Sequence, residues 1–214
     1  MTEMDRAREM RVAEVVGAVA RQALADRGRT RIALLDDGGP EAELAARLLA
    51  AVLGVDAVER VADGGGVESV LHRPAGISPA RWAEEARRTR ARLLDGALPA
   101  HPASKTVLLL GGELPPEPLL PLGDLWASDV AALGGGWSAP DEVRALAEAA
   151  GGIDALDAAL RALIDGRDAA ALDALPAEAR DEVRGRLAAG RASRIFPRVV
   201  PKLGSRTLGA DLFE

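Results

Sequence analysis

Hydrophobic and polar positions follow two different periods along the first quarter of the chain. Residues 4–26 carry apolar side chains near 3.6-residue spacing, which predicts an amphipathic helix. Residues 31–36 form a short apolar run between turn signals, which is typical of a strand buried on both faces of a parallel sheet. A strongly apolar helix is predicted for 41–53, and a weaker strand for 55–61.

The same alternation continues further along the chain and then becomes helical. The pattern predicts an arginine-rich helix at 79–94, a second buried strand at 105–111 and a helix near 124–133. From Pro140 the chain is predicted to be helical almost to residue 192. Strands that alternate with helices indicate an α/β fold: a Rossmann-like parallel sheet with helices on both faces and a helical C-terminal third.

Length and composition narrow the class of protein. The 214 residues are enough for one well-packed domain, and no long linker interrupts them, so we expect a single domain over 1–214. The chain has no cysteine, which excludes disulfides, thiolate metal sites and a cysteine nucleophile. No apolar run approaches the roughly 20 residues of a membrane span, and the first residues are too charged for a secretory signal. We therefore expect a cytoplasmic protein with no membrane partner.

Charge is distributed unevenly. The net charge is −6, yet seven cations and no acid lie between residues 184 and 210, which makes the C-terminal tail 191–214 basic. Such a tail could bind a phosphate-bearing polyanion. It could equally be a solvated surface that pairs with acids of its own body or of a second subunit. The overall acidity, and a basic stretch at 184–210 with only Phe196 to stack on bases, argue against a nucleic-acid partner.

Gly38 and Gly39 follow the first predicted strand, and Pro40 suits the first position of the next helix. Ligands of open parallel sheets lie outside the carboxyl ends of the strands, and a helix N-terminus favours an anion. A pair of glycines in such a turn is more often only a turn. Both interpretations stay open on this feature alone.

Five segments, in order over nearly the whole chain, resemble the ammonia-dependent NAD synthetases of the adenine nucleotide α-hydrolase-like (N-type ATP pyrophosphatase) superfamily. The first, LDDGGPEAELA, is similar to the family's pyrophosphatase loop Ser-Gly-Gly-x-Asp-Ser. KTVLLLG resembles Asn-Lys-(Ser/Thr)-Glu-Leu-Leu-Leu-Gly, and PLGDLWASDV resembles Pro-Ile-Gly-Asp-Leu-Tyr-Lys-Thr-Gln-Val. The segments are 35–45, 105–111, 121–130, the pair 137–142 with 153–157, and 196–209.

The resemblance implies a shortened and diverged member of that family. Its members adenylate nicotinic acid adenine dinucleotide with ATP and Mg²⁺, after which ammonia displaces AMP to give NAD. The resemblance also implies a homodimer and a nucleotide or dinucleotide ligand, with ATP and Mg²⁺ as cofactors if the reaction survives. That chemistry requires bound phosphates, a held magnesium ion and stabilised developing charge.

The sequence departs from the family in the pyrophosphatase loop. Asp37 stands where the family has its first serine, Glu41 where it has aspartate, and Ala42 where it has its second serine; only Gly38 and Gly39 match. A carboxylate about 4 Å from a phosphate charge is repelled by about 4 kcal/mol at an effective dielectric of 20. We therefore predict a degenerate ATP loop.

Two further family positions are lost, and five polar residues remain. Val107 replaces the metal-binding glutamate and Ala127 replaces a lysine, so we predict no catalytic residue and no metal site. Asp124 could instead be a helix N-cap before Leu125. The candidates for nucleotide or anion contacts, or else structural remnants, are Lys105, Thr106, Asp124, Lys202 and Arg206.

Three functions remain open at this point. The chain could be an active amide-forming ligase with a remodelled site, a catalytically silent homodimeric partner or regulatory subunit, or an anion- or nucleotide-binding module. The substitutions at Asp37, Ala42, Val107 and Ala127 affect four separate parts of one mechanism. Such a set is easier to explain by relaxed selection than by adaptation to a new reaction. Whether the chain is an enzyme stays open, and an inactive NAD synthetase-like protein is the favoured interpretation.

Overall fold

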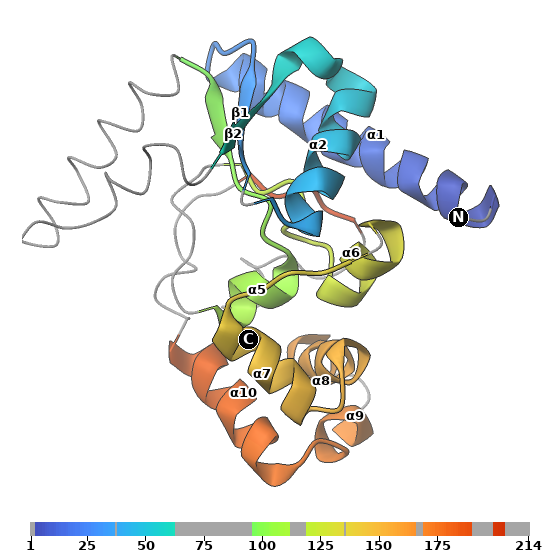
Figure 1. Ribbon diagram of the computed structural model, residues 1–214, viewed down its shortest axis with the longest axis vertical. Helices are drawn as coiled ribbons and strands as arrows, with labels where there is room; N and C mark the ends of the chain where they lie inside the picture. Colours follow the sequence, from blue (N-terminus) through green and yellow to red (C-terminus); the bar gives the residue numbers. More distant parts are fainter. Residues whose placement is uncertain are drawn as a thin grey trace, which may run out of the picture.

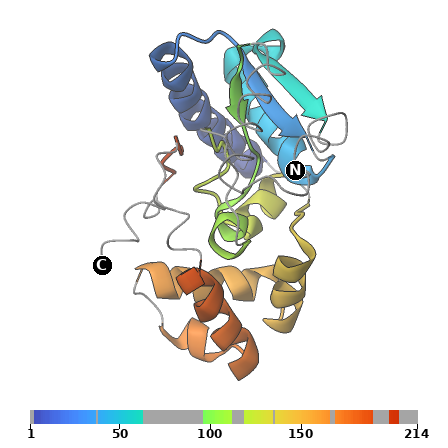
Figure 2. The same ribbon diagram turned by 90° about the vertical axis from the view of Figure 1, so that its left-hand side faces the viewer.

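A parallel sheet with its helices occupies one end of the protein and a helical lobe occupies the other (Figures 1 and 2). The computed structural model describes residues 3–36, 38–62, 96–111, 119–134, 136–165, 169–189 and 199–203. Asp37, Arg206, the predicted helix at 79–94 and most of the basic tail lie outside the described residues.

The sheet contains β1 (Ile32–Asp36), β2 (Val58–Ala62) and β3 (Leu98–Ala100), all parallel, in the order β2-β1-β3. Ile32 stands opposite Val58 on one side and Leu98 on the other. Parallel bridges from Ala100 to Leu119 and from Leu119 to Val199 extend the sheet beyond β3. Residues 32–35 of the central strand are buried, as its apolar run predicts. The α/β, Rossmann-like fold class is confirmed.

Two long helices pack against each other and against β1. Helix α1 (Glu3–Asp26) and helix α2 (Pro40–Leu53) match the helices predicted from the apolar period. The short 3₁₀ helix η1 (Val55–Ala57) takes up the start of the predicted strand at 55–61, and β2 forms its end. One hydrophobic cluster joins α1, α2 and β1 to Leu119, Leu122 and the start of the helical lobe.

The predicted strand at 105–111 is wrong: Lys105–Leu110 forms helix α5. The strand of this unit is β3, which ends five residues before the helix. A short apolar run fits a buried strand and a buried helix equally well, so the sequence pattern could not separate them. Ser104 precedes the helix with extended backbone, and its carbonyl accepts a hydrogen bond from the Leu108 N–H, which closes the first turn.

The remaining helices form the lobe and confirm the helical C-terminal third. All but the first of them pack with α5 and Trp126 around a second hydrophobic cluster. The first contributes Val130 and Leu133 to the cluster shared with the sheet. No described helix is long and apolar enough to cross a membrane. The helices are α6 (Ala127–Gly134), α7 (Asp141–Ala149), α8 (Ile153–Asp165), α9 (Ala169–Asp173) and α10 (Ala177–Ala189).

Gly17 sets how closely α1 and α2 cross, and Gly17→Ala should destabilise the protein. A Cβ at this position would lie 2.4 Å from the Val52 Cβ, so the helices must separate. We expect a loss of about 1–3 kcal/mol, reduced by the roughly 1 kcal/mol by which alanine favours a helix. The measurement is urea unfolding, with Gly185→Ala as control. Nothing lies within 4 Å of that site, so the control should be neutral or slightly stabilising. Equal effects of the two changes would contradict the close crossing.

Candidate functional site

The glycine loop after β1 is tied by the protein's own side chains. The Gly38 N–H donates to Asp36 Oδ1 at 2.9 Å, and Gly38 has the positive φ of 77° that glycine adopts easily. Arg60 of β2 donates to Asp36 at 2.7 Å and to Glu43 of α2 at 2.6 Å. The hydrogen bond from Arg60 lowers the pKa of the Asp36 carboxyl; partial burial opposes this shift, and the Gly38 N–H adds to it. A donor that could face an anion is therefore used within the loop.

Two further residues of the family's loop pattern, Glu41 and Ala42, lie in the first turn of α2 and are buried. Glu41 is only 3% exposed, and its carboxylate accepts hydrogen bonds from the backbone N–H and the hydroxyl of Ser138. It therefore links α2 to the segment before α7, beyond the helix-dipole role that its position in the first turn supplies. Ala42 is fully buried in the core. Neither residue faces an open site.

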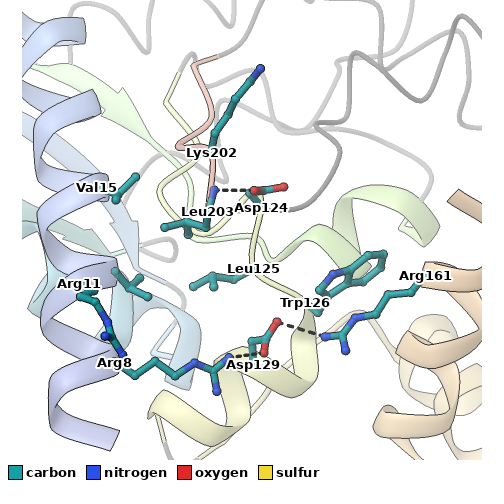
Figure 3. A pocket seen from close by; sticks show the side chains of 11 residues that line it. Arg8, Arg11, Val15, Asp124, Leu125, Trp126, Asp129, Arg161, Lys202 and Leu203 are labelled. Carbon is teal, nitrogen blue, oxygen red and sulfur yellow. Dashed lines mark hydrogen bonds and ion pairs between the residues drawn. The ribbon is translucent and has the colours of Figure 1, made fainter. Parts of the chain in front are cut away.

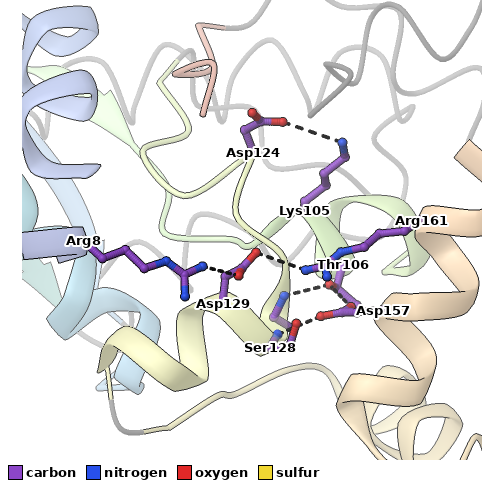
Figure 4. Close-up of polar contacts among 9 residues, drawn as sticks. Arg8, Lys105, Thr106, Asp124, Ser128, Asp129, Asp157 and Arg161 are labelled. Carbon is purple, nitrogen blue, oxygen red and sulfur yellow. Dashed lines mark hydrogen bonds and ion pairs between the residues drawn. The ribbon is translucent and has the colours of Figure 1, made fainter. Parts of the chain in front are cut away.

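Lys105 and Asp124 form a buried ion pair, which Figure 4 shows between α5 and the segment before α6. Their side chains are 0% and 1% exposed, and Lys105 Nζ lies 3.6 Å from Asp124 Oδ1. The same ammonium lies 4.8 Å from the centroid of the Trp126 ring. Asp124 Oδ2 accepts a hydrogen bond of 2.7 Å from the Leu203 N–H. Asp124 is therefore not an N-cap: α6 begins only at Ala127, and the carboxylate serves two partners distant in sequence.

Thr106 and Asp157 together satisfy the start of α6 (Figure 4). Thr106 Oγ1 donates to Asp157 Oδ1 at 2.6 Å and accepts from the Ala127 N–H at 2.9 Å. Asp157 Oδ2 accepts from the Ser128 N–H at 2.7 Å. Burial raises the pKa of Asp157, while the hydrogen bonds from Thr106 and Ser128 and the charge of Arg161 oppose this. Thr106 thus has a structural role, and sequence reasoning missed its partner.

A pocket of about 480 Å³ opens between α1, α8 and the segment at 199–203 (Figure 3). Asp124 and Lys202 are the two sequence-predicted contacts that line it. Lys105 and Thr106 are buried and do not line it. Its lining residues are Arg8, Arg11, Val12, Val15, Asp124, Leu125, Trp126, Asp129, Arg161, Lys202 and Leu203.

Four cations and two acids line this pocket. Asp129 bridges Arg8 at 2.6 Å and Arg161 at 3.2 Å, and the Arg161 guanidinium lies 5.2 Å from the Trp126 ring centroid. Arg11 and Lys202 form no ion pair within the part of the chain that the structure describes. Sequence reasoning missed the three arginines because no local motif joins α1 to α8. The one available signal is the spacing of Arg8 and Arg11, which places them on one face of a helix.

Comparison with known proteins gives a match at the level of structure and none at the level of sequence. No family model matches the chain, and no curated protein matches it. The structure is similar to that of an NH3-dependent NAD synthetase from Campylobacter jejuni subsp. jejuni NCTC 11168 in complex with the nitrate ion, with a TM-score of 0.58 and 16% identity. The match covers 89% of this chain and 98% of that chain. The NAD synthetase-like fold implied by the sequence resemblance is thereby confirmed.

Breaking the buried ion pair from one side should be costly. Lys105→Met leaves the Asp124 carboxylate buried beside an apolar side chain, and we expect a loss of about 3–5 kcal/mol in unfolding free energy. The double variant Lys105→Met/Asp124→Asn removes the uncompensated charge and keeps an acceptor for the Leu203 N–H, so it should recover most of that loss. Chemical denaturation measures both. A single variant as stable as the double variant would contradict the pair's role.

The stability contribution of Asp157 should fall as the pH rises. Because folding raises its pKa above the ordinary value of 3.8 for an aspartate, the native state holds more protons than the unfolded state between these two values. Stability is then lost between that value and the folded pKa. Asp157→Asn should remove this slope, so the unfolding free energy of the variant relative to the parent should increase across that window. Parallel stability–pH curves for the two proteins would contradict the assignment.

Proposed function

We propose that this chain is a NAD synthetase-like protein that has lost the amidation reaction and acts by binding. One observation carries the proposal: the Gly38 N–H in the loop after β1 is donated to the Asp36 carboxylate. In this fold such a loop and the helix that follows it can hold phosphate through backbone N–H groups. Here one of those N–H groups, that of Gly38, already donates to the carboxylate of Asp36.

Charge around the loop supports the same conclusion. A phosphate next to Gly38 would approach the carboxylates of Asp36 and Glu43, and each repulsion at about 4 Å amounts to about 4 kcal/mol at an effective dielectric of 20. Arg60, the cation nearest to both acids, is already hydrogen-bonded to each of them. Asp37 adds a further acid to the loop.

The positions that would handle magnesium and the phosphates are aliphatic. Ala42 and Ala127 are 0% exposed, and Val107 packs at the edge of the second hydrophobic cluster. Among the residues that the structure describes, no three His, Asp or Glu side chains gather where they could hold a metal ion. The described residues do not fit ATP with Mg²⁺, and no catalytic step is derived through them.

Two roles are compatible with a silent site. One is a homodimeric partner or regulatory subunit: the family resemblance implies the dimer, and the absence of cysteine favours the cytoplasm. Light scattering of the purified chain tests the dimer. An anion- or nucleotide-binding module is favoured by a separate observation, the basic pocket between α1 and α8, which none of the described loop residues lines.

The purified protein should form no detectable NAD from nicotinic acid adenine dinucleotide, ATP, Mg²⁺ and ammonium. The Gly38 N–H is already donated and the neighbouring carboxylates repel a phosphate, so pyrophosphate release in a coupled assay should stay at background. Turnover on the order of 1 per second, a rate typical of enzymes, would refute the loss of activity.

Opening the loop should restore nucleotide binding. Asp36→Ala/Asp37→Ser frees the Gly38 N–H, removes two charges and leaves the fully buried Ala42 unchanged. We expect calorimetry to show tighter ATP binding by this variant than by the parent protein. Glu59→Ala is the matched control, because it also removes an acid from the sheet and breaks an ion pair, here with Arg31. If the control gains as much affinity, net charge and not loop closure limits binding.

A further inference from the structure

The basic pocket between α1, α8 and 199–203 has more cations than acids. Asp124 is already compensated by Lys105 behind it, at 3.6 Å. That leaves Asp129 as the acid shared among four lining cations. We propose that this pocket binds a small organic phosphate, whether or not the glycine loop has lost its nucleotide.

Arg8 and Arg161 reach toward each other from two helices that are far apart in the sequence, and Arg11 lies beside Arg8 on α1 (Figure 3). Arg8 and Arg11 come from one face of α1, Arg161 comes from α8 on the opposite side, and Asp129 lies between Arg8 and Arg161. Like charges held this close repel one another unless an anion lies among them. Asp129 meets this need for Arg8 and Arg161, and Arg11 has no such partner in the described chain.

The charge of the ligand follows from the presence of Asp129. A monocarboxylate would replace Asp129 between the two arginines one for one, with no gain. A phosphate monoester carries about −1.5 to −2 charges near pH 7 and three acceptor oxygens. It can therefore accept from Arg8, Arg11 and Arg161 together, and arginine forks suit phosphate geometry.

The size and walls of the pocket indicate an organic body on that phosphate. A volume of about 480 Å³ lies within the roughly 300–1,000 Å³ of small-molecule pockets. Four apolar side chains form part of the wall: Val12, Val15, Leu125 and Leu203. The Trp126 ring also lines the pocket, but Lys105 and Arg161 already lie over it. Lys202 stands at the rim with its exposed side chain directed away from Asp129 (Figure 3), and rotation of its flexible stem brings the ammonium toward a bound ligand.

Asp129 is then an internal competitor of the ligand. An incoming phosphate must take hydrogen bonds that Arg8 and Arg161 now donate to this carboxylate. Removing its charge while keeping its shape should therefore strengthen binding. If Asp129 had only a structural role, Asp129→Asn would loosen the contact between α6, α1 and α8 and would not increase the affinity for the ligand.

The experiment is calorimetry with AMP, inorganic phosphate, adenosine and acetate as probes. AMP should bind more tightly than inorganic phosphate, binding should weaken as salt is added, and adenosine and acetate should give no heat. Absence of binding by AMP and phosphate at millimolar concentration would overturn the proposal. So would adenosine binding as tightly as AMP, because the phosphate would then contribute nothing.

Variants locate the binding. Arg11→Gln removes a charged hydrogen-bond donor and should weaken AMP binding about tenfold. Arg21→Gln is the matched control: it makes the same change at an exposed position of the same helix outside the pocket, and should leave the affinity unchanged. Equal losses in both variants would show diffuse charge attraction and refute the site.

Asp129→Asn should bind AMP several-fold more tightly than the parent. Weaker binding by a folded Asp129→Asn variant would contradict the competition, and far-UV circular dichroism checks folding. If that variant does not fold, the comparison of Arg11→Gln with Arg21→Gln decides the proposal alone. Asp36→Ala/Asp37→Ser leaves the lining of the pocket intact, so Arg11→Gln should still weaken AMP binding in that background, which separates this pocket from the loop.

Discussion

The buried ammonium of Lys105 is the constraint around which the carboxyl edge of the sheet is arranged. A fully buried lysine is stable only with a close counter-charge, because desolvation of an unpaired ammonium costs several kcal/mol. Asp124 provides that charge and also accepts from the Leu203 N–H. One carboxylate thus fixes three segments, the start of α5, the chain before α6 and the piece at 199–203. Two of these segments form a wall of the basic pocket.

Internal carboxylates occupy the places around this edge where an external anion could bind. Asp36 accepts from Gly38 in the loop after β1. Asp157, with Thr106, satisfies the first N–H groups of α6, and Asp129 lies between Arg8 and Arg161. The first two positions leave no excess of donors or positive charge. The third does, because further cations surround it, and this difference separates the loop from the pocket as a candidate for ligand binding.

The sequence could predict those parts of the fold that depend on local pattern. β1, α1 and α2 follow from apolar periodicity and turn residues, and all three formed as expected. The run at 105–111 failed because a short apolar segment between breakers does not distinguish a strand from a helix.

The candidate site depended on contacts between distant segments, which local pattern does not contain. Asp124 looked like an N-cap because its partners, Lys105 and Leu203, are not neighbours in sequence. Glu41 was correctly predicted at the start of a helix. Its hydrogen bond from Ser138 could not be predicted, because Ser138 lies on a distant segment. The arginines of the pocket were missed for the same reason. The family resemblance identified positions that differ from the family pattern, and only the structure showed how the polar residues contact one another.

Three positions at which the sequence departs from the NAD synthetase pattern are packing positions in this fold. Ala42 and Ala127 are completely buried, and Val107 packs against the second hydrophobic cluster. A serine, lysine or glutamate at such a position would need a hydrogen bond or a counter-charge to offset its desolvation. An aliphatic side chain needs neither, so each departure from the family pattern removes a demand on the core. A return to the reactive residues would therefore oppose stability unless a bound ligand supplied the missing partners. The likeness of fold persists at 16% identity because the apolar pattern that forms the sheet does not depend on the polar residues of a site.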